Sequence, residues 1–259
     1  MVEHDGWYHL HDDDPLFIAL HGTDLDAIDA ELDGVVRTGV DLSKVVHGHH
    51  ETQPLLEIVV NNAPPGAAKL LLKHGFDPNA PDVFGEPPLF KSDLMTTEVV
   101  EAFLVAGARV NATTVDGRTP LFRACYDPVE IHTVQVLLDA GVDVRAIDEH
   151  GQIALHEATS NDGDPSELVR LLLDAGSPVD LADRDERTPL LNAAQCGHVA
   201  TVQLLLERGA SPGRVVMHPS FPVLIANDAQ ALVRIAAERT VLRDAAGEAN
   251  GGKADRRRL

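Results

Sequence analysis

Histidine and carboxylate side chains gather at two places near the start of the chain. The first holds His9, His11 and the acidic run 12–14, and the second holds His47, His49 and His50. Imidazole and carboxylate groups are ligands of zinc and similar metals, so a metal-dependent enzyme built on these histidines is one hypothesis. No further residues in the sequence close a coordination shell around either group. We expect these histidines to be solvent-exposed loop residues and predict no metal site.

The sequence offers no other arrangement typical of a catalytic centre or a cofactor site. Its two cysteines, Cys125 and Cys196, lack the C-x-x-C spacing of a zinc site and are too few for a disulfide framework. No G-x-S-x-G turn, phosphate-binding loop or dinucleotide fingerprint is present. We therefore predict no catalytic residues, no cofactor and no enzymatic activity, with both thiols reduced.

The chain is strongly acidic, and its charge argues against two classes of partner. Of 259 residues, 21 are Lys or Arg and 41 are Asp or Glu, for a formal net charge of −20 at pH 7. Such a field repels nucleic-acid phosphates and anionic lipid surfaces, so we predict neither nucleic acid nor membrane as a partner. The sequence shows no signal peptide and no apolar run of about 18 residues. We expect a cytoplasmic protein, and the excess of Arg over Lys is typical of a GC-rich bacterial source.

A short signature recurs along nearly the whole chain at intervals of 32 to 39 residues. Its seven copies are Pro15-Leu16, Pro54-Leu55, Pro88-Leu89, Pro120-Leu121, Ala154-Leu155, Pro189-Leu190 and Pro222-Val223. Pro fits the first turn of a helix, and a preceding residue such as Thr119, Thr188 or Asp14 can cap that helix. About twenty residues later an apolar run ends in glycine, as in Leu204-Leu205-Leu206 before Gly209, which predicts a second helix closed by a left-handed glycine.

Helix, tight turn, helix, glycine and turn at this period resemble the ankyrin repeat family. The resemblance is most specific at Asp116-Gly117-Arg118-Thr119-Pro120-Leu121 and at Arg187-Thr188-Pro189-Leu190-Leu191-Asn192-Ala193-Ala194. It implies an all-α solenoid of about seven helix-turn-helix units with hairpin-like connectors, capped at both ends. The predicted domains are an N-terminal extension over 1–13, repeats over 14–240 starting near 14, 53, 87, 119, 153, 188 and 221, and a disordered tail over 241–259. The resemblance also implies structural hydrogen bonds for His156 and His198.

Two departures from the repeat pattern predict surface insertions. The long first interval contains Val46-His47-Gly48-His49-His50, which we interpret as an extended fingertip. The fifth repeat places residues 160–165 between its two helices. Leu171 and Leu205, in the apolar runs of the fifth and sixth repeats, are expected to be buried between repeats.

Resemblance to the family implies that a protein partner docks on the concave face, between the motif residues. The predicted partner-binding residues are Val83, Phe84, Val115, Arg118, Tyr126, His150, Gln152, Arg184 and Arg187. Phe84 and Tyr126 are the predicted hot spot, because exposed aromatic side chains dominate interface energies. Leu94 and Met95 fit either this surface or the core of an irregular third repeat.

The sequence leaves the partner and pathway open. The leading hypothesis is a monomeric adaptor or regulator that binds an unidentified protein. An alternative is an inhibitor or immunity-type protein whose acidic surface covers a basic target, and such a complex would weaken steeply with salt.

Overall fold

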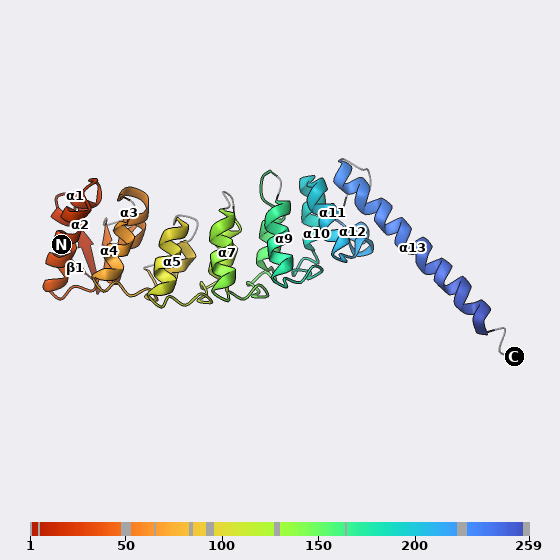
Figure 1. Cartoon of the computed structure of the whole chain (residues 1–259), viewed down its shortest axis with the longest axis horizontal. Helices are drawn as coiled ribbons and strands as arrows, with labels where there is room; N and C mark the ends of the chain where they lie inside the picture. The colour runs from red at the N-terminus through yellow and green to blue at the C-terminus, as the bar shows by residue number, and fades with distance from the viewer. Residues whose placement is uncertain are drawn as a thin grey trace. The chain divides into compact units, whose positions relative to one another are not determined.

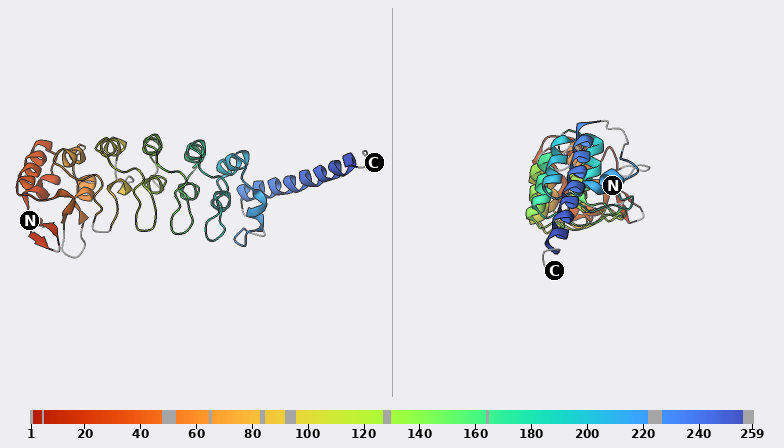
Figure 2. Two further views of the ribbon diagram at one scale, coloured as in Figure 1. Left: turned by 90° about the horizontal axis from the view of Figure 1, so that it is seen from below. Right: turned by 90° about the vertical axis from the view of Figure 1, so that its right-hand side faces the viewer.

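The computed structural model describes residues 2–4, 6–47, 53–64, 66–82, 85–91, 96–126, 130–163, 165–221 and 227–255. The chain divides into two compact units, Met1–Ala146 and Ile147–Leu259 (Figure 1). Both units are mainly helical, and in each the connecting turns extend to one side of the paired helices (Figure 2). Each unit thus has the mainly helical composition expected for the repeats, apart from a small sheet near the start of the chain.

The helices of the first unit form pairs that match the predicted repeats. The unit contains α1 (Pro15–Leu20), α2 (Leu25–Arg37), α3 (Leu55–Asn62), α4 (Ala67–Lys73), α5 (Thr97–Val105), α6 (Pro120–Ala124) and α7 (Ile131–Asp139). Helices α1 and α2, α3 and α4, and α6 and α7 pack as pairs, and α2, α4, α5 and α7 contact one another in that order. In the third repeat, the first helix is replaced by a short 3-10 turn over Pro88–Lys91. Leu94 and Met95 lie outside the described residues.

The second unit continues the same pattern. It contains α8 (Ala154–Ala158), α9 (Ser166–Asp174), α10 (Pro189–Cys196), α11 (Val199–Glu207), α12 (Pro212–Met217) and α13 (Asp228–Asp255). Helices α8 and α9 form one pair and α10 and α11 the next, while α9, α11 and α13 pack successively. The predicted start of the seventh repeat, at Pro222-Val223, lies outside the described residues.

The predicted helix boundaries follow from local chemistry. Pro15, Pro120 and Pro189 each occupy the first turn of a helix, where the missing N–H costs no hydrogen bond. Thr188 caps α10 by accepting a hydrogen bond from the Leu191 N–H at 3.3 Å. The predicted cap is absent at the other two helices, since no N–H of α1 or α6 donates to the Asp14 or Thr119 side chain. The glycines that end the second helices have φ between +83° and +93°, the left-handed region that favours glycine. They are Gly39, Gly75, Gly107, Gly141, Gly176 and Gly209.

A four-stranded sheet replaces the predicted N-terminal extension and extended fingertip. Its strands are β1 (Val2–His4), β2 (Trp7–Leu10), β3 (Val45–His47) and β4 (Gln53–Pro54), in the order β1-β2-β3-β4. The central β2 and β3 are parallel, and the outer pairs are antiparallel. Leu10, Val45 and Val46 are buried, so this segment belongs to the core and is not a surface insertion at those residues. The backbone N–H and C=O groups of these buried strands are hydrogen-bonded to neighbouring strands. This pairing joins residues far apart in the sequence, so the repeat pattern does not predict it.

Large apolar side chains of both helices of each pair form the core, and those of the second helices include its largest members. In the first unit these include Leu71, Val100, Phe103 and Leu137, all fully buried. In the second unit, Leu205 is fully buried as predicted, but Leu171 is only half-buried and Leu172 occupies the core position. In a run of three leucines, helical geometry turns only some side chains toward the neighbouring helix.

The C-terminal part of the second unit differs most from the sequence predictions. Helix α12 lies in a segment for which only a hairpin-like connector is predicted, and Pro212 stands in its first turn. Helix α13 continues to Asp255, through most of the predicted disordered tail. Four alanines between residues 241 and 255 favour a helix there in spite of three glycines.

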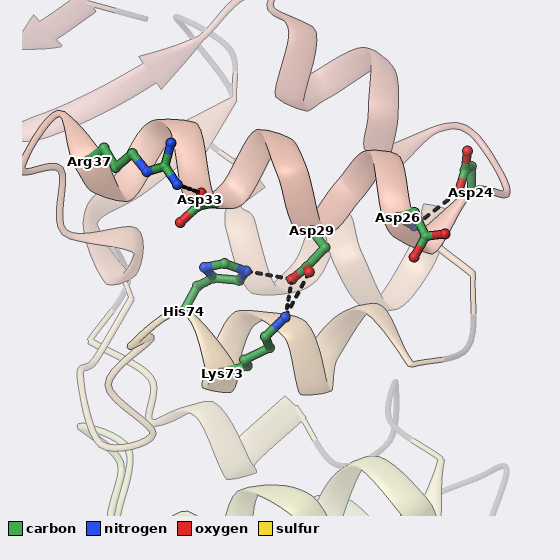
Figure 3. A network of polar contacts seen from close by, with 7 residues as sticks. All are labelled: Asp24, Asp26, Asp29, Asp33, Arg37, Lys73 and His74. Atoms are coloured by element: carbon green, nitrogen blue, oxygen red, sulfur yellow. Dashed lines mark hydrogen bonds and ion pairs between the residues drawn. The ribbon is translucent and has the colours of Figure 1, made fainter.

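A polar network links the first two repeats (Figure 3). Lys73 and His74, at the end of α4, both donate to the Asp29 carboxylate of α2, at 2.7 and 2.6 Å. The hydrogen bond from Lys73, followed by that from His74, lowers the pKa of Asp29. Asp24 caps the start of α2 by accepting from the Asp26 N–H. The contacts of Asp29 join α2 to the end of α4, and none of these residues belongs to the predicted site.

Candidate functional site

Four successive turns between helix pairs share one hydrogen-bond pattern, and we call them the fingertips. They are residues 82–86, 114–118, 148–152 and 183–187. In each, the backbone N–H of the first residue donates to the carbonyl of the last residue, at 2.8 to 3.0 Å. The first side chain accepts from the last N–H at 2.9 to 3.2 Å, and these first residues are Asp82, Thr114, Asp148 and Asp183. The two hydrogen bonds close each turn, and in the last three fingertips the exposed middle residues include Val115, His150 and Arg184.

The fourth residue of each fingertip has a left-handed backbone. Gly85, Gly117 and Gly151 occupy this position with φ near +80°, whereas Glu186 occupies it at +60°. Gly151 also permits close packing, because an added Cβ would lie 3.1 Å from the Arg184 nitrogen. That nitrogen donates to the His150 carbonyl at 2.9 Å, so the last two fingertips are joined through their backbones.

Side-chain amides connect the segments next to the fingertips in the first unit. Asn79 accepts from the Arg109 N–H at 2.7 Å and donates to the Gly107 carbonyl at 3.0 Å. Asn111 makes the same pair of contacts one repeat later, with Asp143 and Gly141. This ladder holds neighbouring turns at a fixed spacing, which preorganises the side chains between them.

Val115 and Tyr126 are the apolar and aromatic residues of the predicted site that the structure, where it describes that site, places in solvent. Val115 is 84% exposed at its fingertip and Tyr126 is 50% exposed just after α6. The Arg123 guanidinium lies 5.5 Å from the centre of the Tyr126 ring, within cation–π range. Arg118 is half-buried, with its guanidinium 5.9 Å from the centre of the buried Phe122 ring.

The predicted residues of the second unit divide into two groups. His150 and Arg184 are exposed, so both are available to a partner. Gln152 and Arg187 are half-buried, and the Gln152 amide donates to the Asp183 carboxylate at 2.9 Å. Gln152 therefore connects two fingertips as well as bordering the surface.

Val83 and Phe84 lie outside the described residues, so the aromatic half of the predicted hot spot remains a prediction. Among the described residues, the predicted list omits the carboxylates that shape the fingertips. Burial alone would raise the pKa of Asp183, but hydrogen bonds from Gln152 and from the Arg187 and Asp185 N–H groups outweigh it and lower the pKa. The recurrence of Asp82, Asp148 and Asp183 at equivalent places was the signal in the sequence.

The two repeat histidines have different environments. His156 is buried, its Nδ1 accepts from the Ile153 N–H at 3.2 Å, and its Nε2 lies 3.3 Å from the Arg187 carbonyl. Burial lowers the pKa of His156. The implied structural role is thus present for His156, whereas Nε2 of His198 is buried and makes no hydrogen bond within the described residues.

The N-terminal histidines are more ordered than the sequence predicts. His47 stands on β3, its Nε2 lies 2.8 Å from the Asp12 carboxylate, and its ring stacks on Phe17 with 4.1 Å between centres. His9 lies on β2 and is half-buried. Neither is the fully exposed loop residue expected. His49 and His50 lie outside the described residues. Over the described ranges, no three His, Cys, Asp or Glu side chains come together as metal ligands would.

Two other sequence predictions concern helices and thiols. Among the helices described, none combines the length and apolarity required of a membrane-spanning segment.

Cys125 is buried, Cys196 is exposed, and both are free thiols. Burial and the nearby Asp162 raise the pKa of Cys196, which leaves the thiol a weaker nucleophile at neutral pH.

Comparison with known proteins identifies the repeat. The family profile described as "Ankyrin repeats (3 copies)" matches residues 55–148, 92–177 and 129–215, which together span more than half of the chain. Human ankyrin repeat and SOCS box protein 6 is 32% identical over 182 residues, covering 60% of this chain and 42% of that protein. Neurogenic locus notch homolog protein 1 of Xenopus tropicalis is 32% identical over 151 residues, covering 56% of this chain and 6% of that protein.

A third relative, an ankyrin repeat protein of fowlpox virus, is 33% identical over 143 residues, covering 54% of this chain and 20% of that protein. In all three relatives the matched region is less than half of the protein. These relatives are eukaryotic and viral, so they give no support to the predicted bacterial source.

Proposed function

Because the chain belongs to the ankyrin repeat family, whose repeats form protein–protein interaction modules, we propose that it is an adaptor or regulator that binds a protein partner through its fingertips and first helices. Proteins of this family are generally not enzymes, and we propose no catalytic role or cofactor for this chain. The same proposal includes the predicted cytoplasmic location, the monomeric state and a concave binding face.

The exposure of large side chains on an ordered scaffold carries this proposal. Val115 is 84% exposed, yet it stands in a turn closed by hydrogen bonds in both directions between Thr114 and Arg118. Ordered and exposed apolar groups lose little conformational entropy on binding and gain the energy of burial. Tyr126 adds an aromatic ring to the same repeat.

We predict that the double substitution Val115→Ala and Tyr126→Ala abolishes capture of the partner. The protein is used as bait in an extract of its native cells, and captured proteins are compared by mass spectrometry. Both side chains are exposed, so the melting temperature should stay close to that of the parent protein. Val105→Ala is the matched control, because Val105 is 89% exposed at the end of α5 and is not a predicted site residue.

Capture of the same proteins by the double variant would exclude this surface as the binding site. A melting temperature far below that of the parent would instead show that the two side chains support the fold.

The acidic inhibitor is retained as a second candidate because of the net charge of −20. It predicts that capture weakens steeply between low and physiological salt, since attraction between exposed charges is screened over about 8–10 Å. Capture through Val115 and Tyr126 should change little over that range.

A further inference from the structure

An apolar groove lies between α12 and α13, within the second unit. Its lining residues are Gly213, Val216, Met217, Ala237, Glu238, Thr240, Val241 and Leu242. Met217 is 84% exposed, Leu242 70% and Val241 67%. Exposed large apolar side chains that gather in one place are typical of an interaction site. None of these residues belongs to the predicted partner-binding set.

The backbone around the groove restricts what can occupy it. Both walls are helices, whose N–H and C=O groups are already hydrogen-bonded along their own axes, so an extended strand would find few partners there. A helix satisfies its own backbone and can insert one apolar stripe between Met217 and Leu242. The occupant that fits is therefore an amphipathic helix.

The charged side chains described around the groove are mainly basic, whereas the chain as a whole carries a formal net charge of −20. On α12 and the side chains described for α13, four arginines stand against two carboxylates, Asp228 and Glu238. Arg214, Arg239 and Arg243 are exposed next to lining residues. The polar face of a bound helix would lie among these arginines.

We propose that the groove between α12 and α13 binds an acidic amphipathic helix of a partner protein, at a site additional to the fingertips. The charge favours this occupant over a second copy of the chain, because a two-fold dimer at this groove would bring two sets of these arginines together. Met217 suits such a surface, since its flexible thioether adapts to different apolar shapes.

The test uses two synthetic peptides of about 15 residues, which is four turns of helix. Both carry Leu at positions i, i+3, i+4 and i+7; the polar positions are mainly Glu in the first peptide and mainly Lys in the second. Binding of each labelled peptide to the whole chain is followed by fluorescence anisotropy. We define the groove signal as the difference in peptide binding between the parent protein and the double variant Met217→Gln with Leu242→Gln. This difference excludes binding of the Lys peptide to acidic surfaces elsewhere on the chain, which the double variant retains.

We expect the Glu peptide to bind and the double variant to weaken its binding at least tenfold. Met217→Leu should bind like the parent, and so should Val105→Gln, which changes an equally exposed side chain outside the groove. Circular dichroism and thermal melting should be unchanged, because the substituted side chains lie in solvent. Arg243→Glu should reduce binding of the Glu peptide and lower its dependence on salt.

Three results would overturn the proposal. The first is equal binding of the Glu peptide by the parent and the double variant. The second is a groove signal for the Lys peptide equal to that for the Glu peptide. The third is sedimentation of the parent as a dimer that the double variant abolishes, which would assign the groove to a second copy. The fingertip variant Val115→Ala with Tyr126→Ala leaves the peptide assay unaffected, so failure of either proposal is distinguishable from failure of the other.

Discussion

At the scale of single residues, the fingertips depend on side chains and backbone angles that recur from repeat to repeat. Asp148 and Asp183 accept from two N–H groups each, and the left-handed fourth position is glycine in three of the four fingertips. Glu186 is the only described non-glycine residue with positive φ. The last fingertip therefore holds backbone strain that its counterparts avoid.

We predict that Glu186→Gly stabilises the chain by about 0.5–1 kcal/mol, because relief of the left-handed strain exceeds the added entropy of glycine in the unfolded state. Urea denaturation measures the change. Glu149→Gly removes the same charge from the preceding fingertip at a residue without positive φ, so it should lower stability by a similar amount. A shift of both midpoints in the same direction would show that backbone strain is not the cause.

His156 should make stability depend on pH below neutrality. Burial lowers its pKa in the folded state, so below about 6.5 the unfolded chain binds a proton that the folded chain does not. The contribution of His156 is therefore complete above pH 6.5 and is lost as the pH falls from there. The lowered pKa values of Asp29 and Asp183 act in a separate window, below 3.8.

Urea denaturation at pH 7.5 and pH 5.5 tests this prediction. His156→Asn should be less stable at pH 7.5, because it disturbs hydrogen bonds at Ile153 and Arg187, and should lose less stability between the two pH values than the parent. An equal loss in parent and variant would assign the pH dependence to other groups.

At the scale of elements, several first helices are very short and depend on their neighbours. The six-residue α1 and five-residue α6 and α8 are too short to be stable alone. They are held by buried leucines such as Leu121 and Leu155 and by the neighbouring second helix. In the third repeat, the described part of the first-helix position is a four-residue 3-10 turn, which is shorter than α1, α6 or α8.

Leu205→Ala and Leu172→Ala should each destabilise the second unit by about 2–5 kcal/mol, because both remove a fully buried side chain and leave a cavity. Leu171→Ala should cost clearly less, since Leu171 is half-buried. Chemical denaturation of the three variants gives the comparison. A loss for Leu171→Ala as large as for Leu172→Ala would place the core face of α9 elsewhere.

At the scale of the whole molecule, charge is distributed unevenly along the chain. The net charge of −24 over residues 1–207 favours basic partners at long range, whereas the C-terminal part, residues 208–259 at +4, does not oppose an acidic one. The proposed fingertip site and the proposed groove thus present different electrostatic environments. Two partners of unlike charge could then be bound by one chain, in keeping with an adaptor.

The sequence alone determined the repeat, because its signals are local. Proline and threonine at helix starts, apolar runs and left-handed glycines depend on a few neighbouring residues, and all recur at the repeat period. The same local pattern correctly predicted that Val115 and Tyr126 are exposed. The resemblance to the family implied structural hydrogen bonds for His156 and His198, and the structure shows them for His156.

Only the tertiary structure decided features that depend on residues far apart in the chain. The pairing of β2 with β3 joins residues 8–10 to 45–47, and no local pattern marks such a partner. The choice of Leu172 over Leu171 as the core residue, and the coupling of Gln152 to Asp183, depend on where neighbouring elements lie. The groove between α12 and α13 likewise exists only because two helices pack together, and one of them stands where the sequence predicted a simple connector.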